Sequence, residues 1–158
     1  MGSDSGYGFI ITFEDFLTHY KNGKATITLK GNQTPMVPEA VADIETDRVL
    51  AVTSKGRLLI FDVNQLPRLK KGKGNKIIHI PKSGSDDDHP EVLKHLKILP
   101  LDSNLVIHAG KHFLRLSPGN QSDYTGMRGR RGKLLPRGYR NVDTIEVVPI
   151  QPADDQGS

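Results

Sequence analysis

The chain has 158 residues, a formal net charge of +4, 25% charged and 35% apolar residues, and no cysteine. This size predicts one domain, or part of one, with enough residues for a buried core. The lack of cysteine excludes disulfides and thiolate-based metal sites or nucleophiles, and no stretch approaches the roughly 18 apolar residues of a membrane-spanning helix.

Most of the predicted elements are short strands bounded by Gly, Pro, Asn and Asp. In chain order they cover residues 8–13, 25–29, 49–53, 57–63, 76–80, 96–99, 105–108, 112–116 and 144–148. Two further segments, residues 14–21 and residues 90–97, predict helices of one or two turns, the second with Asp88 as its cap. With 10 prolines and 16 glycines, the chain is predicted to be all-β.

A pattern recurs at intervals of about 50 residues. Its first part, a glycine followed by an apolar strand, occurs at residues 5–13, 55–63 and 109–116. Its second part, a glycine and a lysine followed by apolar residues, occurs at residues 22–27, 73–78 and 131–135. A third, strand-rich part occurs at residues 40–53 and 95–108, with a single copy at residues 142–148. The chain therefore contains about three repeats.

A four-stranded unit of about 50 residues has the size of one propeller blade, and each blade buries a face on the next. The repeats predict propeller-like blades over residues 5–148, followed by a disordered acidic tail at residues 149–158. Because the glycine–lysine turn recurs at one place per blade, we expect these turns to lie on one rim. The alternative is a β-sandwich whose turns resemble each other by chance.

The positive charge is concentrated in two short stretches that contain no acid. Residues 67–82 and residues 128–140 each carry six Lys or Arg, so together they hold 12 of the 22 cations. Cations present only for solubility would be spread over the surface. The clustering indicates binding sites for a polyanion, and the glycines at positions 72 and 74 suggest a backbone that approaches the ligand closely. Solvated basic loops are the alternative.

We expect these cations to contact the phosphates of duplex DNA, in contacts that are independent of base sequence and sensitive to salt. No row of aromatic residues accompanies them, so stacking on single-stranded bases is not indicated. The predicted contacts at the first rim position are Arg68, Lys70, Lys71, Lys73 and Lys76. Those at the second are Arg128, Arg130, Arg131, Lys133, Arg137 and Arg140, and a weaker third group comprises Lys21, Lys24 and Lys30.

No catalytic or metal site is predicted. A glycine turn separates His108 from His112, which favours a hairpin pair over metal ligands, and the acidic run at residues 86–89 is interpreted as a solvated loop. Residues 6–8, Gly-Tyr-Gly, lack the following Gly-Lys-Ser/Thr and helix of a phosphate loop, so we expect a turn between strands. The Ser, His and Asp residues follow no catalytic order, and no tyrosine is marked as a nucleophile.

Four motifs distributed over the chain point to a known family. They are Ser-Asp-Ser-Gly-Tyr-Gly-Phe at 3–9, Gly-Arg-Leu-Leu-Ile-Phe at 56–61, Lys-Gly-Lys-Gly-Asn-Lys-Ile-Ile at 71–78 and Arg-Gly-Arg-Arg-Gly-Lys-Leu at 128–134. With Val-Asp-Thr-Ile-Glu at 142–146, they resemble the C-terminal domain of the A subunit of bacterial DNA topoisomerase IV, a type IIA topoisomerase related to gyrase. The resemblance covers residues 5–148.

The resemblance implies a β-pinwheel, in which propeller-like blades are completed by strand exchange. It implies a module that binds and bends duplex DNA, and that presents DNA segments for the ATP-dependent strand passage of decatenation and relaxation in chromosome segregation. It places catalysis, ATP, Mg²⁺ and the contact with the topoisomerase IV B subunit in other parts of such an enzyme, so we expect no cofactor here. It also implies a cytoplasmic, nucleoid-associated bacterial protein without membrane contact.

The sequence departs from the gyrase A-subunit box, a Gln-Arg-Arg-Gly-Gly-Lys-Gly type of motif. Residues 70–74 (Lys-Lys-Gly-Lys-Gly) and residues 130–133 (Arg-Arg-Gly-Lys) match it only in part. We therefore expect DNA contact and bending rather than full wrapping and the introduction of negative supercoils. Because such a family domain usually has more blades than three, the chain is interpreted as the C-terminal part of one. The alternative function is a protein-interaction module that docks a chromosome-organising ATPase.

Overall fold

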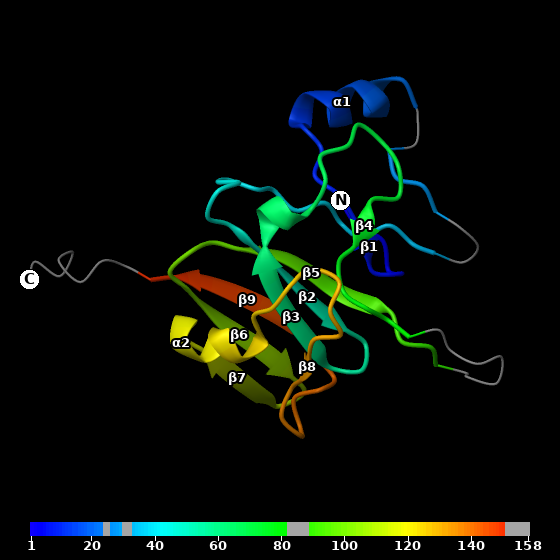
Figure 1. Cartoon of the computed structure of the whole chain (residues 1–158). Helices are drawn as coiled ribbons and strands as arrows, with labels where there is room; N and C mark the ends of the chain where they lie inside the picture. Colours follow the sequence, from blue (N-terminus) through cyan, green and yellow to red (C-terminus); the bar gives the residue numbers. More distant parts are fainter. Residues whose placement is uncertain (24–25, 30–32, 82–88, 151–158) are drawn as a thin grey trace, which may run out of the picture.

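The computed structural model describes residues 1–23, 26–29, 33–81 and 89–150, and within them the strands form three separate sheets (Figure 1). The first sheet pairs β1 (Tyr7–Gly8) with β4 (Asn75–Lys76). The central sheet has the order β5 (Leu93–Leu99), β2 (Arg48–Thr53), β3 (Arg57–Asp62) and β8 (Lys133–Leu134). The third has the order β7 (His112–Leu116), β6 (Ser103–Ala109) and β9 (Thr144–Pro149).

Helical structure in these residues is limited to short elements. The longest is α1 (Phe13–Lys21), which stands at one end of the molecule, away from the third sheet (Figure 1). The others are α2 (Pro118–Gln121) and two single 3₁₀ turns, η1 (Val63–Gln65) and η2 (Ser122–Tyr124). None of these described helices is long and apolar enough to cross a membrane.

The central sheet is buried on both faces, which explains why β2 and β3 are continuous apolar runs rather than alternating ones. Leu50 and Leu58 contribute to a core shared with the third sheet. Val49 and Leu59, their neighbours in the chain, contribute to a second core that contains Ile77 and other residues near the first sheet. Each such fully buried aliphatic side chain stabilises the fold by about 1.5–3 kcal/mol.

Strand exchange links the three sheets. β8 follows β7 in the chain, yet Leu134 pairs with Arg57 of β3. In the same way β4 follows β3, yet Lys76 pairs with Tyr7 of β1. β1, β3 and β7 are therefore equivalent strands of successive repeats, and the glycine–lysine segment of one repeat completes the sheet of the repeat before it. The all-β prediction and the repeat pattern are both confirmed.

One predicted helix is wrong. The segment at residues 90–97 enters β5, which runs antiparallel to β2 from the pair Arg48–Leu99 to the pair Thr53–Leu93. Local sequence favoured a short helix, but the edge of β2 offers hydrogen bonds that a strand here satisfies. Asp88, its predicted cap, lies outside the described residues.

Other boundaries differ from the predictions for local reasons. Of the strand predicted at residues 8–13, only Gly8 lies in β1, and Thr12 instead caps α1, because its side chain accepts a hydrogen bond from Asp15 N at 3.1 Å. Residues 77–80 do not continue β4 as a strand. Of the strand predicted at residues 25–29, only residues 26–29 are described, and Ile27 forms an isolated bridge with Gly72. Of the predicted tail, Pro149 ends β9, and residues 151–158 lie outside the described part.

Candidate nucleic-acid interface

The described parts of the two acid-free stretches are called here the first basic segment, residues 67–81, and the second basic segment, residues 128–140. In each segment a glycine with positive φ directly precedes the exchanged strand. The φ angle is 82° at Gly74, before β4, and 79° at Gly132, before β8. A Cβ atom on Gly74 would collide with the backbone of Gly8, and one on Gly132 would lie 3.0 Å from Leu58 O. Gly74 therefore lets the chain approach its own first sheet, and the space beside it is not left for a ligand.

The first basic segment begins as a loop attached to the N-terminal strand region. Ile10 N donates to Pro67 O, and Leu69 N donates to Ile10 O, both at 2.8 Å. These main-chain bonds fix the path of the loop without using its cationic side chains. Three of the predicted phosphate contacts are exposed on it: Arg68, Lys70 and Lys71.

The remaining cations of the first basic segment have partners within the protein. Lys73 Nζ lies 4.0 Å from the centroid of the Tyr7 ring, a favourable cation–π distance. Lys76 Nζ donates to His79 Nδ1 at 3.2 Å. Both lysines are half-buried, so their positions are better defined than those of the exposed loop cations.

The second basic segment uses several of its cations to bind main-chain carbonyl groups. Arg128 Nη1 donates to Lys76 O at 2.8 Å, and Arg128 N donates to Gln65 Oε1 at 2.8 Å. Arg140 Nε donates to Leu135 O at 2.8 Å. The exposed cations of this segment are Arg130, Lys133, Arg137 and Arg140.

Main-chain hydrogen bonds bring the two basic segments together. Gly129 N donates to Ile77 O at 2.9 Å, and His79 N donates to Arg130 O at 2.8 Å. The contact of Arg128 with Lys76 O lies at the same place. We call residues 76–79 and 128–131 the basic junction. Two stretches that the sequence placed at separate rim positions thus meet at one point.

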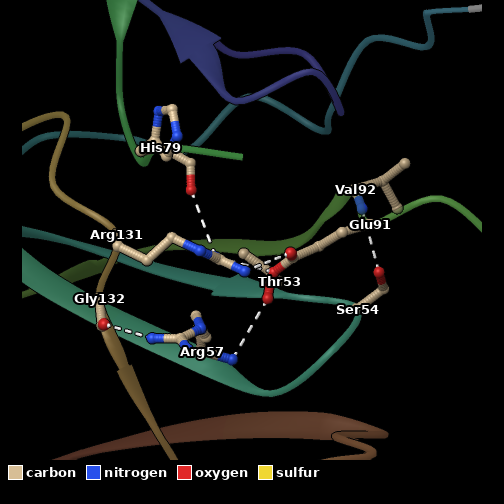
Figure 2. A network of polar contacts seen from close by, with 8 residues as sticks. All are labelled: Thr53, Ser54, Arg57, His79, Glu91, Val92, Arg131 and Gly132. Atoms are coloured by element: carbon tan, nitrogen blue, oxygen red, sulfur yellow. Dashed lines mark hydrogen bonds and ion pairs between the residues drawn. The ribbon is translucent and has the colours of Figure 1, made fainter. Parts of the chain in front are cut away.

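Arg131 points into the junction rather than away from it. Its guanidinium donates to both carboxylate oxygens of Glu91, at 2.6 and 3.0 Å, and to His79 O at 3.3 Å (Figure 2). The Glu91 side chain is 4% exposed. Burial alone would raise the pKa of Glu91, but hydrogen bonds from Arg131 and Thr53 and the nearby positive charge outweigh it and lower the pKa. The carboxylate therefore stays ionised, and Arg131 is occupied by it.

The third predicted group is only partly described. Lys21 is exposed in the last turn of α1, whereas Lys24 and Lys30 lie outside the described residues. The chain between them contacts the first basic segment, because Gly72 N donates to Thr26 O at 3.0 Å and Thr28 N donates to Gly72 O at 2.7 Å. Residues 26–28 therefore lie beside Gly72 of the first basic segment.

A groove of about 950 Å³ lies beside α1 and the first basic segment, and Arg68 and Lys70 are among its lining residues. Its lining is mainly apolar and includes Phe9, Phe13, Phe16, Val41, Leu69 and Ile98. Phe13, at the start of α1, is 74% exposed. A surface of this kind is suited to contact with protein rather than with phosphate.

Catalytic machinery is not apparent in the part of the chain that the structure describes. No group of three His, Asp or Glu side chains there is placed to hold a metal ion. His108 Nε2 lies 3.1 Å from Glu146 Oε1, and His108 and His112 occupy facing strands of a hairpin, as predicted. Burial, with a smaller contribution from Asp123, raises the pKa of Tyr124, the opposite of what a tyrosine nucleophile needs.

Sequence reasoning missed Glu91 and Gln65, which hold the second basic segment in place. Neither carries a local signal, because each is polar, belongs to no motif and contacts residues 40 or 63 positions away. The sequence shows that Glu91 and the basic segments have opposite charges, but it does not show which cation pairs with Glu91.

The chain is similar to known proteins over most of its length. The model of the family described as DNA gyrase C-terminal domain, β-propeller, matches residues 1–34 and 47–86. The A subunit of DNA topoisomerase 4 from Pseudomonas aeruginosa is 45% identical over 154 residues, which is 98% of this chain and 20% of that protein. The corresponding protein from Escherichia coli is 46% identical over 147 residues, 93% of this chain and 19% of the relative. The chain thus spans about a fifth of the length of these relatives.

Solved structures agree with the fold. The structure of the Escherichia coli ParC C-terminal domain superposes with a TM-score of 0.80 and 41% identity, covering 95% of this chain and 60% of that one. The DNA gyrase A C-terminal domain superposes with a TM-score of 0.67 at 16% identity, covering 95% of this chain and 47% of that one, which shows a shared fold. The propeller-like architecture predicted from the repeats is confirmed, and the β-sandwich alternative is excluded.

Proposed function

This chain belongs to the DNA gyrase C-terminal domain family, and on that premise we propose that it is a duplex DNA-binding and bending module of the topoisomerase IV A-type polypeptide. The observation that carries the proposal is the basic junction, where two acid-free segments are joined by hydrogen bonds from Gly129 to Ile77 and from His79 to Arg130. Exposed cations flank it on both segments. A duplex presents a continuous row of phosphates, and adjoining basic segments contact it over more than one helical position.

The chemistry of the exposed side chains favours contact with the backbone of DNA. Lys70 and Lys71 are flexible point charges, and Arg130 offers a planar fork that suits a phosphate. Such contacts position a duplex without reading its bases. Contacts on two adjoining segments would favour a bent path, because bending lets more phosphates reach cations.

The test is a titration of a fluorescently labelled linear duplex of mixed sequence with the full chain at several salt concentrations. We expect log K to fall linearly with log salt, with a slope of about −0.9 for each phosphate contacted. Duplexes of different sequence should bind alike. Binding that is absent, or that does not respond to salt, would contradict the proposal. Bending is measured on the same duplex labelled at both ends, whose ends should approach each other on binding.

The wider role is also a proposal, because the chain covers a fifth of the relatives' length. We infer that the module presents DNA segments for ATP-dependent strand passage, with decatenation and relaxation as the products. ATP, Mg²⁺ and the B subunit would then be bound by other parts of the enzyme. A module that binds duplex DNA in a bacterium would be found with the nucleoid.

A second function, docking of a chromosome-organising ATPase, is favoured by the apolar groove beside α1. Its exposed Phe13 and neighbouring Phe16 offer an apolar contact for another protein, next to Arg68 and Lys70, which also line the groove. The two functions are compatible. Binding of such a partner that survives neutralisation of Lys70 and Lys71 would support the second function, and loss with Phe13→Ser would locate it in the groove.

A further inference from the structure

We propose that the ion pair of Glu91 with Arg131 is a clamp that positions the second basic segment for DNA, so that a buried acid is required for binding. This inference rests on the proposed DNA-binding function and assigns a positioning role to two residues. It also reassigns Arg131, which its place among the cations had marked as a phosphate contact.

The geometry of the pair favours a clamp over a phosphate contact. Both Nη atoms of Arg131 are used, one to each oxygen of Glu91, with a further bond from Nη1 to His79 O. The paired carboxylate is almost completely buried, so it loses its bidentate partner if Arg131 turns outward. An uncompensated buried carboxylate is strongly unfavourable. Arg131 is therefore retained by Glu91 while DNA is bound.

The clamp acts on three consecutive residues of the second basic segment, as Figure 2 shows in part. Arg130 O accepts from His79 N at 2.8 Å. Arg131 holds Glu91, and Gly132 O accepts from Arg57 Nη1 at 3.1 Å. With the backbone fixed on both sides, the exposed side chains of Arg130 and Lys133 leave the segment from defined positions. These two residues are the ones that the clamp would place for phosphate contact.

Glu91 is itself held by the turn between β2 and β3. Val92 N donates to Ser54 Oγ at 3.0 Å, and Ser54 N donates to Val92 O at 2.8 Å (Figure 2). The neighbouring Thr53 is fully buried, and its Oγ1 accepts from Arg57 N at 3.2 Å. The clamp therefore connects the second basic segment to the rigid central sheet rather than to a mobile surface group.

For the loss of Glu91, the clamp predicts a change in DNA affinity opposite in direction to the change expected from charge alone. Removing an acid near a phosphate-binding surface raises the affinity for DNA if charge alone matters. If Glu91 positions the segment, Glu91→Gln lowers the affinity although it makes the chain more positive. Loss of one phosphate contact weakens binding about fivefold near physiological salt, and it reduces the magnitude of the log–log salt slope by roughly 0.9.

The experiment measures binding of the full chain and its variants to the labelled duplex across a salt series, with circular dichroism confirming that each variant is folded. For Glu91→Gln we expect an affinity about fivefold lower and a shallower slope. The matched control is Glu146→Gln, which removes the same charge from a side chain that is 61% exposed on β9. Its affinity should equal or exceed that of the unaltered chain.

A second variant, Arg131→Lys, keeps the charge but loses the two-pronged contact. As a clamp residue it should behave like Glu91→Gln, and as a phosphate contact it should bind DNA almost normally. If Glu91→Gln does not fold, the affinity of Arg131→Lys tests the clamp instead.

An affinity for DNA that is unchanged or higher in these variants overturns the clamp. Weaker binding at an unchanged salt slope also overturns it, because such a result indicates only a smaller folded fraction. If the unaltered chain shows no salt-dependent binding, the proposed function fails and the clamp with it; if it binds but the variants match it, only the clamp fails.

Discussion

The two basic segments carry similar charge, five cations in the first and six in the second, but differ in what their less exposed cations do. In the first, Arg68, Lys70 and Lys71 are exposed on a loop whose path is fixed by main-chain hydrogen bonds. In the second, Arg128 and Arg131 are anchored to the protein by several hydrogen bonds each. Exposed cations are therefore present in both segments, but in the second segment the arginines that face the protein also stabilise the fold.

This difference shows that charge density does not measure binding capacity. Arginine is suited to both tasks, because its planar fork bonds to carbonyls and carboxylates as readily as to phosphates. Lysine, a single hydrated ammonium group, is less suited to holding a backbone. We therefore expect the exposed cations of the lysine-rich first segment to affect DNA binding with little effect on stability, and the arginine-rich second segment to affect both.

The largest expected effect is on folding. Arg131→Ala leaves the carboxylate of Glu91 buried without its partner, which should lower the free energy of unfolding by about 3–5 kcal/mol. The exposed Lys71→Ala should change it by no more than about 0.5 kcal/mol. Urea denaturation of both variants measures the difference. Equal and small losses would remove the distinction between the two segments.

The next effect is on binding. Changing Arg68, Lys70 and Lys71 together to Gln should weaken duplex binding on the order of 100-fold near physiological salt and flatten the salt slope by roughly 2.7. Folding should be unaffected, because all three are exposed. The matched control changes three exposed cations outside both segments, Lys94, Lys111 and Arg115. A loss in the control as large as in the triple variant would show that only total charge matters.

A smaller effect separates two neighbours within the second segment. Arg130→Gln should weaken binding about fivefold near physiological salt, with a slope change of roughly 0.9. Its side chain is exposed, so the free energy of unfolding should stay within about 0.5 kcal/mol. Fluorescence titration and urea denaturation of the same preparation give both values. A stability loss like that of Arg131→Ala would contradict the assignment of Arg130 to the free cations.

The smallest effect concerns acid stability. The pKa of Glu91 is lowered below its ordinary value of 4.5, so its contribution to stability is complete above that value and is lost as pH falls through the folded-state pKa. Denaturation at a series of pH values below 4.5 should show a smaller loss for Glu91→Gln than for the unaltered chain. Parallel losses would mean that other carboxyl groups carry the acid sensitivity.

Much of the architecture was readable from local patterns. The repeated glycine–strand and glycine–lysine parts became β1, β3 and β7 and the exchanged strands β4 and β8, because turn chemistry and apolar runs are local properties. The clustering of cations was equally plain. The phosphate contacts themselves stay a prediction.

Two structural features depend on contacts between residues that lie far apart in the chain. Residues 93–99 became a strand because β2 presents an unpaired edge to them, against a weak helical preference. Arg130 and Arg131 are adjacent and chemically identical, yet one is exposed and the other holds Glu91 across 40 positions. A side chain's charge is encoded locally, but its availability depends on which partner the folded backbone brings within hydrogen-bonding distance.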